Sequence, residues 1–223
     1  MRLRNKPWVR EFLKANKKYL IFWEKENEAL NLRSLFQTNQ LCQLEIGCGK
    51  GSFISQQALQ NADINYIGME KVTTVVGVAL KRSLKLFKEN NKEMSNLKYF
   101  NYFAEDLSFI FKKNSIDKIY LNFSDPWPKA KHEKKRLMHN NFLKIYAYIL
   151  KEFGTIEFKT DNDVFFEFAI EQINQNPHWL IISQTTDLYN EPILLKNNVA
   201  TEYETKFHAM GKNINKLIIK KTN

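Results

Sequence analysis

Asp125 stands in a setting that holds a carboxylate in place. It belongs to the segment DPWP, where an apolar run ends and Pro126 and Pro128 follow. Proline fixes its own backbone and restricts the residue before it, so the chain around Asp125 has few conformations. A rigid carboxylate can stabilise positive charge that develops in a reaction. Trp127 is either a stacking surface for a base or an anchor packed on the domain, and an isolated tryptophan favours the anchor.

A dense run of basic residues comes directly after this acid. Residues 129–136 read KAKHEKKR. Such a run is usually a solvated helix start. Its place beside a predicted reaction centre favours another interpretation, in which it holds the phosphates of a nucleic acid without reading the base sequence.

A glycine-rich turn follows the first strongly apolar run. The segment LEIGCGKG contains one acid and three glycines, Glu45, Gly47, Gly49 and Gly51. Glycine lets a backbone turn tightly and approach a ligand closely. Glu70 ends the next apolar run, NYIGME, roughly 20 residues further on, where nucleoside-binding sheets place a carboxylate that accepts ribose hydrogen bonds. Alone, Glu70 would be taken for a solvated acid at a strand end.

The acid beside the glycines separates two classes of cofactor. Glu45 would oppose a pyrophosphate at a helix N-terminus, whereas it suits a ligand with a positive end. S-adenosylmethionine has a sulfonium and an ammonium group at one end and an adenosine at the other, which fits Glu45 and Glu70 together. The pattern therefore resembles that of class I methyltransferases, and a nicotinamide dinucleotide is the alternative cofactor.

A third polar segment, NYFAEDL, follows the third apolar run. Glu105 and Asp106 come directly after Ala104. Either carboxylate could face the adenine amino group of a bound cofactor, or it could cap the helix that follows. Both interpretations stay open.

Short apolar runs alternate with helical patterns from residue 41 onward. Alternating strands and helices predict right-handed βαβ units in a mainly parallel, doubly wound α/β sheet with helices on both faces. The ligand crevice of such a sheet lies at the carboxyl ends of its strands, where the glycines and the acids fall. The predicted strands are 41–46, 64–69, 97–103, 116–123, 155–158 and 180–183, and the predicted helices are 53–59, 73–89, 138–151 and 164–174.

The two ends of the chain differ from this pattern. Residues 1–35 carry nine Lys or Arg against four acids and are predicted to form a basic N-terminal arm, partly helical or mobile. A single domain over residues 36–223 follows. Near the C-terminus, 206–210 and 216–221 are predicted to pair as a hairpin, which adds an antiparallel terminal strand to the sheet.

Composition narrows the class of protein. The 223 residues are 43% hydrophobic with 7 Gly and 5 Pro, which suits one domain with a sizeable core. A net charge of +10 favours a polyanionic partner, nucleic acid or an acidic membrane surface, although a Lys-rich background would give the same charge. Two cysteines without metal-ligand spacing, and the lack of an export signal or spanning segment, predict a cytoplasmic protein without a metal site.

Five segments together resemble bacterial tRNA (guanine-N7-)-methyltransferases. They are LEIGCGKG, NYIGME, DPWPKAKHEKKR, FKTDN at 158–162 and TEYETKF at 201–207, and the opening MRLRNKPW is similar to that family's start. The resemblance covers nearly the whole chain in the family's order. It implies a class I methyltransferase fold, S-adenosylmethionine as cofactor, tRNA as partner without a membrane, and a monomer or homodimer. It also implies methylation of guanine N7 at position 46 of the tRNA variable loop.

The resemblance assigns roles to individual residues. Asp125 falls on the catalytic position. Phe103 stands where the family commonly has an acid before the alanine, so the adenine contact is expected from Glu105 or from backbone groups. The cofactor-binding set is Glu45, Gly47, Gly49, Gly51, Glu70, Ala104, Glu105 and Asp125; the substrate-binding set is Lys129, Asp161, Thr201, Glu202, Tyr203 and Glu204; the RNA-binding set is Lys131, His132, Glu133, Lys134, Lys135 and Arg136.

Methylation of guanine N7 needs no general base, because N7 has an in-plane lone pair and no proton. The site is therefore predicted to align N7, the methyl carbon and sulfur, and to place Asp125 against the positive charge on the purine. Asp161 and Glu204 are predicted to accept the guanine N1 and N2 hydrogens. The alternatives are a methyltransferase for another RNA or for an amine or amide, and a non-enzymatic RNA-binding module.

Overall fold

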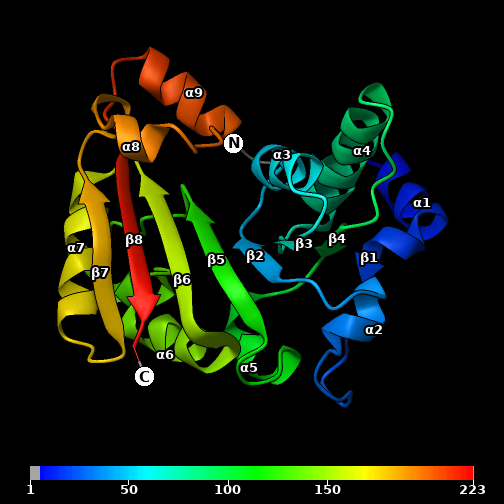
Figure 1. Ribbon diagram of the computed structural model, residues 1–223, viewed down its shortest axis with the longest axis horizontal. Helices are drawn as coiled ribbons and strands as arrows, with labels where there is room; N and C mark the ends of the chain where they lie inside the picture. The colour runs from blue at the N-terminus through cyan, green and yellow to red at the C-terminus, as the bar shows by residue number, and fades with distance from the viewer. Residues whose placement is uncertain (1–5, 223) are drawn as a thin grey trace.

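An eight-stranded sheet runs through the centre of the molecule (Figure 1). The structure, a computed structural model, describes residues 6–222, so the first five residues of the MRLRNKPW segment lie outside the described part. The strand order is β1-β4-β3-β2-β5-β6-β8-β7. The bounds are β1 (Leu20–Ile21), β2 (Cys42–Ile46), β3 (Asn65–Met69), β4 (Leu97–Phe100), β5 (Ile116–Asn122), β6 (Leu150–Thr160), β7 (Trp179–Thr185) and β8 (Asn215–Lys221).

Helices cover both faces of this sheet. Figure 1 shows α3 and α4 on one face and α5, α6 and α7 on the other. Within residues 6–222, no helix is both long and apolar enough to cross a bilayer. The α-helices are α1 (Trp8–Ala15), α2 (Leu32–Phe36), α3 (Ser52–Gln60), α4 (Thr73–Glu89), α5 (Leu107–Ile110), α6 (Asn140–Ile149), α7 (Asp163–Asn174), α8 (Pro192–Leu195) and α9 (Glu202–Ala209), and the 3-10 helices are η1 (Lys17–Tyr19), η2 (Ala104–Asp106), η3 (Ala130–Lys135) and η4 (Leu188–Asn190).

The strand pairing is that of a doubly wound sheet. β2 pairs in parallel with both β3 and β5, β3 pairs in parallel with β4, and β5 with β6. The chain therefore winds outward in one direction from β2 and in the other from β5. A crevice opens at such a switch point, outside the carboxyl ends of the strands. The predicted α/β fold with a mainly parallel sheet is confirmed.

Two hydrophobic cores lie on the two faces of the sheet, because successive strand residues point to opposite sides. On β3, Tyr66 belongs to the cluster under α3 and α4, whereas Ile67 belongs to the cluster under α5, α6 and α7. Both side chains are at most 1% exposed. A parallel sheet buried on both faces explains why NYIGM is an unbroken run of mostly apolar residues rather than an alternating one.

The described part of the N-terminal segment packs on the sheet. β1 pairs in parallel with β4 at the edge of the sheet, and Trp23 is 6% exposed in the core. The side chain of Val9 on α1 lies directly against Gly77 on α4, where an added Cβ would come within 2.5 Å of it. Helix α1 is thereby tied to α4. The domain boundary at residue 35 stays a prediction.

The predicted terminal hairpin is wrong. Residues 206–209 lie in α9 instead of a strand, because Thr201 and Glu204 form a capping box that starts a helix there. β8 does run antiparallel, but it inserts between β6 and β7 and pairs with both of them. The sheet thus gains its antiparallel strand from the C-terminus by a different pairing.

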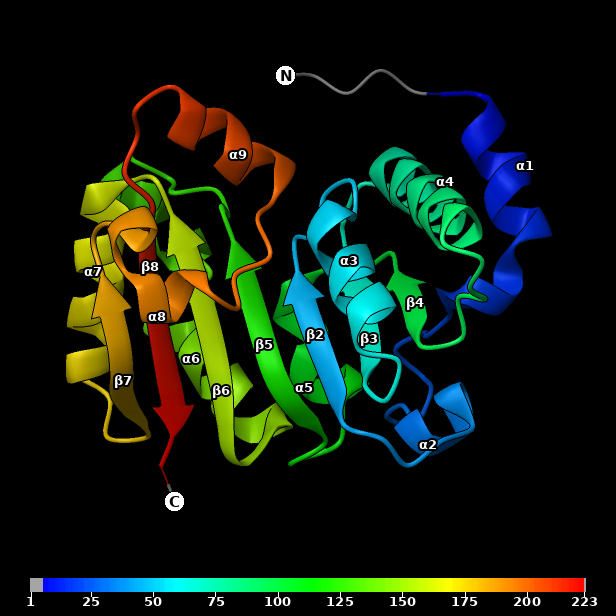
Figure 2. The same ribbon diagram turned by 45° about the horizontal axis from the view of Figure 1, so that its top comes forward.

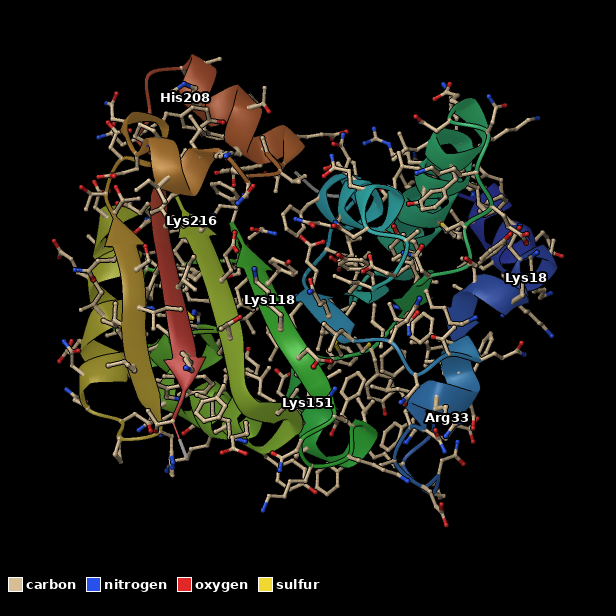
Figure 3. The ribbon with its side chains drawn as sticks, in the orientation of Figure 1. Lys18, Arg33, Lys118, Lys151, His208 and Lys216 are labelled. Atoms are coloured by element: carbon tan, nitrogen blue, oxygen red, sulfur yellow. The ribbon has the colours of Figure 1, made fainter. Side chains whose placement is uncertain are left out.

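An ion cluster links three neighbouring strands on the sheet. The carboxylate of Glu157 on β6 lies 2.8 Å from Lys118 Nζ on β5 and 2.9 Å from Lys216 Nζ on β8. Figure 3 labels both lysines, one on each side of β6. Burial raises the pKa of Glu157, but the two lysines outweigh it and lower that pKa to about 2. The carboxylate of Glu157 is therefore ionised at neutral pH.

Candidate active site

A cavity of about 460 Å³ opens at the carboxyl ends of β2, β3, β4 and β5. It lies at the switch point between β2 and β5, where the fold predicts a ligand site. Its wall brings together segments that are far apart in the sequence. They are Ile46 and Gly47, Met69 to Lys71, Tyr102 to Glu105, Phe123 to Asp125, Trp127, Lys135, Leu137 and Phe142.

The glycine turn leaves space in front of the sheet. Gly47 and Gly49 have φ of 76° and 53°, in the left-handed region that favours glycine, and a Cβ on either would meet nothing within 4 Å. The backbone N–H groups of Gly47 and Cys48 each donate to the Met69 carbonyl oxygen at 2.9 Å. Gly51 differs, since a Cβ there would lie 2.4 Å from Tyr99 Oη. The first two glycines leave room for a ligand, and the third allows close packing on β4.

Glu45 is a buried acid with one free oxygen. Its side chain is 2% exposed, Asn122 Nδ2 donates to Oε1 at 2.8 Å, and Oε2 has no hydrogen-bond partner in the described part. Burial raises the pKa of Glu45 to about 7, although the Asn122 hydrogen bond and the charge of Lys159 oppose this. A buried carboxylate oxygen without a partner fits a cationic ligand group, which is the property that S-adenosylmethionine requires of this position.

Glu70 lies on the same cavity wall, at the end of β3. Its Oε1 accepts a hydrogen bond from the Val72 N–H at 2.9 Å, and its backbone carbonyl accepts one from Asn101 Nδ2 at 2.9 Å. These contacts fix the turn that carries the carboxylate. Glu70 is one of the cavity-lining residues, and a ribose contact is predicted for it.

The two acids of the third polar segment have different surroundings. Glu105 lines the cavity together with Phe103 and Ala104. Asp106 instead lies with Oδ1 3.5 Å from Lys25 Nζ, and it makes no side-chain capping hydrogen bond at the start of α5. Phe103 is 56% exposed at the cavity wall. The geometry therefore favours Glu105 over Asp106 for the adenine side of the cavity.

The DPWP loop presents Asp125 to the cavity on a strained backbone. Phe123 and Trp127, on either side of the acid, have φ of 51° and 42°. Bulky residues rarely adopt the left-handed region, and such strain persists where the surroundings enforce it and is common at active sites. Asp125 is exposed and lines the cavity. Trp127 is half-buried on the same wall, with the His132 ring edge-on at 5.4 Å.

One member of the basic run is a structural part of this loop. Arg136 is 8% exposed; its Nε donates to the Pro126 carbonyl at 3.0 Å and its Nη2 to the Trp127 carbonyl at 3.2 Å. Its guanidinium lies 4.3 Å from the centre of the Phe168 ring. Arg136 thus holds the loop from behind. The lysines of the run are exposed: Lys129, Lys131, Lys134 and Lys135.

Helix α9 is anchored above the sheet by a fully buried ion pair. Lys159 Nζ on β6 lies 2.5 Å from Glu204 Oε2, and both side chains are 0% exposed. Lys159 also donates to Asn198 Oδ1 at 3.0 Å, and Asn198 Nδ2 donates to Glu204 Oε1 at 2.6 Å. The carboxylate predicted to contact guanine is therefore enclosed by protein groups. The geometry favours an anchoring role for Glu204, and its contact with guanine stays a prediction.

The exposed residues of α9 contact both the DPWP loop and α4. The Tyr203 ring lies 4.9 Å from the Phe123 ring of the DPWP loop. Glu202 forms an ion pair with Arg82 of α4. Burial and the charge of nearby Asp161 raise the pKa of Tyr203. Figure 2 shows α9 and α4 standing on opposite sides of the carboxyl edge of the sheet. Tyr203 thus lies beside the DPWP loop, with Asp161 near it.

Three residues of this region had no role predicted from the sequence. Asn122 supports Glu45, Lys159 anchors Glu204, and Arg82 meets Glu202. Lys159 lies inside the FKTDN segment, which marked the region but not the residue. Partners separated by 77, 45 and 120 positions leave no local pattern to detect.

Comparison with known proteins identifies the family. A family model described as "Putative methyltransferase" matches residues 39–217. The tRNA (guanine-N(7)-)-methyltransferase of Mesoplasma florum is 65% identical over 223 residues, covering 100% of both chains. The chain belongs to the tRNA (guanine-N(7)-)-methyltransferase family. A tRNA (guanine-N(7)-)-methyltransferase of Geobacillus sp. is 41% identical over 221 residues, covering 99% of this chain and 96% of the relative.

Comparison with a solved structure supports the fold independently of the sequence relatives. The 16S rRNA methyltransferase KamB superposes with a TM-score of 0.63 at 12% identity, covering 88% of this chain and 96% of that one. At this identity the likeness concerns the fold, and it confirms the predicted methyltransferase architecture. The individual residue roles in this member of the tRNA (guanine-N(7)-)-methyltransferase family stay predictions. What the structure adds is that Gly47, Glu70, Glu105 and Asp125 share one cavity.

Proposed function

We propose that this protein transfers the methyl group of S-adenosylmethionine to N7 of a guanine in tRNA, at position 46 of the variable loop, by direct displacement without a general base. Family membership supports the methyl transfer and the tRNA substrate. The observation that carries the proposal is the shared cavity, which Gly47, Glu70, Asp125 and Lys135 all line. The position in the variable loop rests on the sequence resemblance.

Two parts of the cavity suit the two ends of the cofactor. Gly47 lines the cavity; the open space at Gly47 and Gly49, together with the buried, unpartnered oxygen of the neighbouring Glu45, would hold the cationic amino-acid end. Glu70 and Glu105 would accept hydrogen bonds from the adenosine end. When bound, the cofactor supplies an electrophilic methyl group on a sulfonium. The neighbouring carboxylates would then stabilise positive charge and orient the ligands, without transferring a proton.

Asp125 is assigned to the positive charge that develops on the purine. Its carboxylate is exposed in the cavity on a loop fixed by two prolines and by Arg136. A preorganised charge at such a place stabilises the transition state without reorganisation. Asp161, near Tyr203, is assigned to the guanine N1 and N2 hydrogens. The exposed lysines of the basic run would hold the phosphates beside the target base.

The reaction is tested with labelled S-adenosylmethionine and unmodified tRNA transcript, followed by mapping of the labelled base. We expect label on N7 of the variable-loop guanine. Label on another base of tRNA would contradict the position, and label on protein only would contradict the substrate.

Asp125→Asn tests the assigned acid. Removing one preorganised electrostatic partner lowers turnover by on the order of 10²- to 10³-fold. Cofactor affinity, measured by calorimetry, should fall far less. Asp63→Asn, in an exposed position, is the matched control and should retain turnover. Full turnover of Asp125→Asn with normal affinity for tRNA and cofactor would remove Asp125 from the mechanism.

A further inference from the structure

A second hollow of about 850 Å³ lies between α1 and α4, outside the catalytic cavity. We refer to it as the α1–α4 groove. Figures 1 and 2 both show the two helices side by side at the β1 end of the sheet. Its lining residues are Lys6, Trp8, Phe12, Val78, Lys81, Arg82, Leu84, Lys85 and Lys88.

Cations dominate the rim of the groove. Lys81, Lys85 and Lys88 recur at four- and three-residue spacing, which places them along one face of α4. Among the described residues, Lys85 has an acid partner, Glu89, at 3.6 Å, and no salt bridge is found for Lys81 or Lys88. Such a concentration of uncompensated positive charge raises the local concentration of anionic groups.

The floor of the groove carries an aromatic ring beside the cations. Trp8 is 37% exposed, with Lys81 Nζ 4.7 Å and Lys6 Nζ 6.0 Å from the centre of its ring. A flat ring with cations around it can pack against a ribose or a base while the cations meet phosphates. Nucleic-acid backbone fits this surface, because its phosphates can meet the lysines while a ribose or base packs on Trp8. The basic groups of a peptide would find no acid among the lining residues.

Direct contacts connect the groove to the catalytic cavity. Arg82, on the groove wall, forms an ion pair with Glu202 of α9. The next residue, Tyr203, lies 4.9 Å from Phe123, which lines the catalytic cavity beside Asp125. Since α4 and α9 flank the carboxyl edge of the sheet (Figure 2), an RNA whose base enters the cavity has further backbone within reach of α4.

We propose that the α1–α4 groove binds backbone phosphates of the tRNA body, as a second contact separate from the basic run after Asp125. This inference rests on the proposed function, because it names another surface for the same substrate. The groove holds the body of the RNA, and the DPWP loop holds the segment that is methylated. Contacts to phosphates fix position and carry no base sequence.

The test is a triple variant, Lys81→Gln, Lys85→Gln and Lys88→Gln, which leaves Arg82 and its partner Glu202 intact. Its affinity for unmodified tRNA is measured by filter binding over a series of salt concentrations. Each phosphate contact contributes about 0.7–0.9 to the slope of log affinity against log salt, so the slope should become shallower by roughly 2–3. Affinity at low salt should fall on the order of tenfold or more.

A matched control removes the same number of charges elsewhere. Lys112→Gln, Lys113→Gln and Lys144→Gln change exposed lysines before β5 and on α6, across the sheet from α4. We expect this control to bind tRNA with a slope close to that of the unchanged protein. In the groove variant the loss should appear in the KM for tRNA, while affinity for S-adenosylhomocysteine stays the same.

Four results would separate the proposal for the groove from the proposed function. Equal slopes for the groove variant and the control, in a protein that methylates tRNA, would refute the groove alone. Loss of binding to phosphatidylglycerol vesicles with unchanged tRNA binding would assign the surface to a membrane and refute it as well. A protein that binds no tRNA would refute both the groove and the proposed function. A shallower slope together with label on a different base would support the groove and refute the proposed position.

Discussion

At the scale of single residues, the proposed contact between Glu45 and the cofactor predicts that cofactor binding depends on pH. The free carboxyl has a pKa of about 7, raised by burial, and its Oε2 has no partner in the described part. A cationic ligand favours the charged carboxylate. Below pH 7 binding must therefore release a proton, and affinity falls as the pH falls. Above pH 7 the carboxylate is already charged, so this dependence ends.

We expect the affinity for S-adenosylmethionine to weaken by up to about tenfold per pH unit below 7, as proton linkage requires. Glu45→Gln cannot release the proton, so it should bind more weakly with a flatter profile. Calorimetric titrations of both proteins between pH 5 and 8 measure the difference, in which the ionisation of the cofactor itself cancels. Parallel profiles would show that Glu45 does not titrate on binding.

Arg136 offers a second test at the residue scale. Family resemblance assigns it to RNA binding, whereas its hydrogen bonds indicate that it supports the DPWP loop. Arg136→Ala leaves two loop carbonyls without their donor. A small misplacement of Asp125 would cost on the order of 10²-fold in turnover. Arg136→Lys keeps the charge but loses the planar fork of donors. We expect Lys to rescue turnover poorly and to leave the salt dependence of tRNA binding unchanged. Full rescue by Lys would favour a phosphate contact.

At the scale of elements, α9 depends on the pair formed by Lys159 and Glu204. Both side chains are fully buried, and breaking a buried ion pair by removing one partner costs about 3–5 kcal/mol. Glu204→Gln should lower the free energy of unfolding by an amount of that order, because the Lys159 charge stays buried. Lys159→Met with Glu204→Leu removes both charges and should recover much of the loss. Urea unfolding of the three proteins measures this, and an unchanged Glu204→Gln would contradict the anchoring role.

Helix α9 also shows which features of the fold could be predicted from sequence patterns and which could not. The strands and helices around the glycine turn were predictable, because apolar periodicity and glycine spacing are local. Residues 206–210 were mistaken for a strand, although Thr201 and Glu204 carry a capping-box pattern that marks a helix start. The burial of Arg136 could not be foreseen, since a charged run is ordinarily solvated. The pairing of Lys159 with Glu204 depends on the folded sheet and has no signature along the chain.

At the scale of the whole molecule, the Glu157 cluster ties β5, β6 and β8 together and makes stability depend on acid. The pKa of Glu157 is lowered from 4.5 to about 2. A lowered carboxyl pKa contributes stability that is complete above pH 4.5 and is lost as the pH falls through 2. The shift corresponds to roughly 3 kcal/mol.

We expect the free energy of unfolding to fall more steeply between pH 4.5 and 2 in the unchanged protein than in Glu157→Gln. The variant should be less stable at pH 7, where it leaves Lys118 and Lys216 without their carboxylate. Other carboxyl groups titrate in the same window, so the difference between the two unfolding curves isolates Glu157. Identical slopes in both proteins would show that the cluster contributes nothing.

The position of β8 determines when the sheet can be completed as the chain is synthesised. It follows β7 in the sequence, yet it lies between β6 and β7 and pairs with both of them. A chain still attached to the ribosome has its central parallel strands available early, but the position beside β6 stays unfilled until residues 215–221 emerge. Completion of the sheet therefore waits until residues 215–221 have been made, and a chain truncated before residue 215 leaves β7 without a neighbour in the sheet.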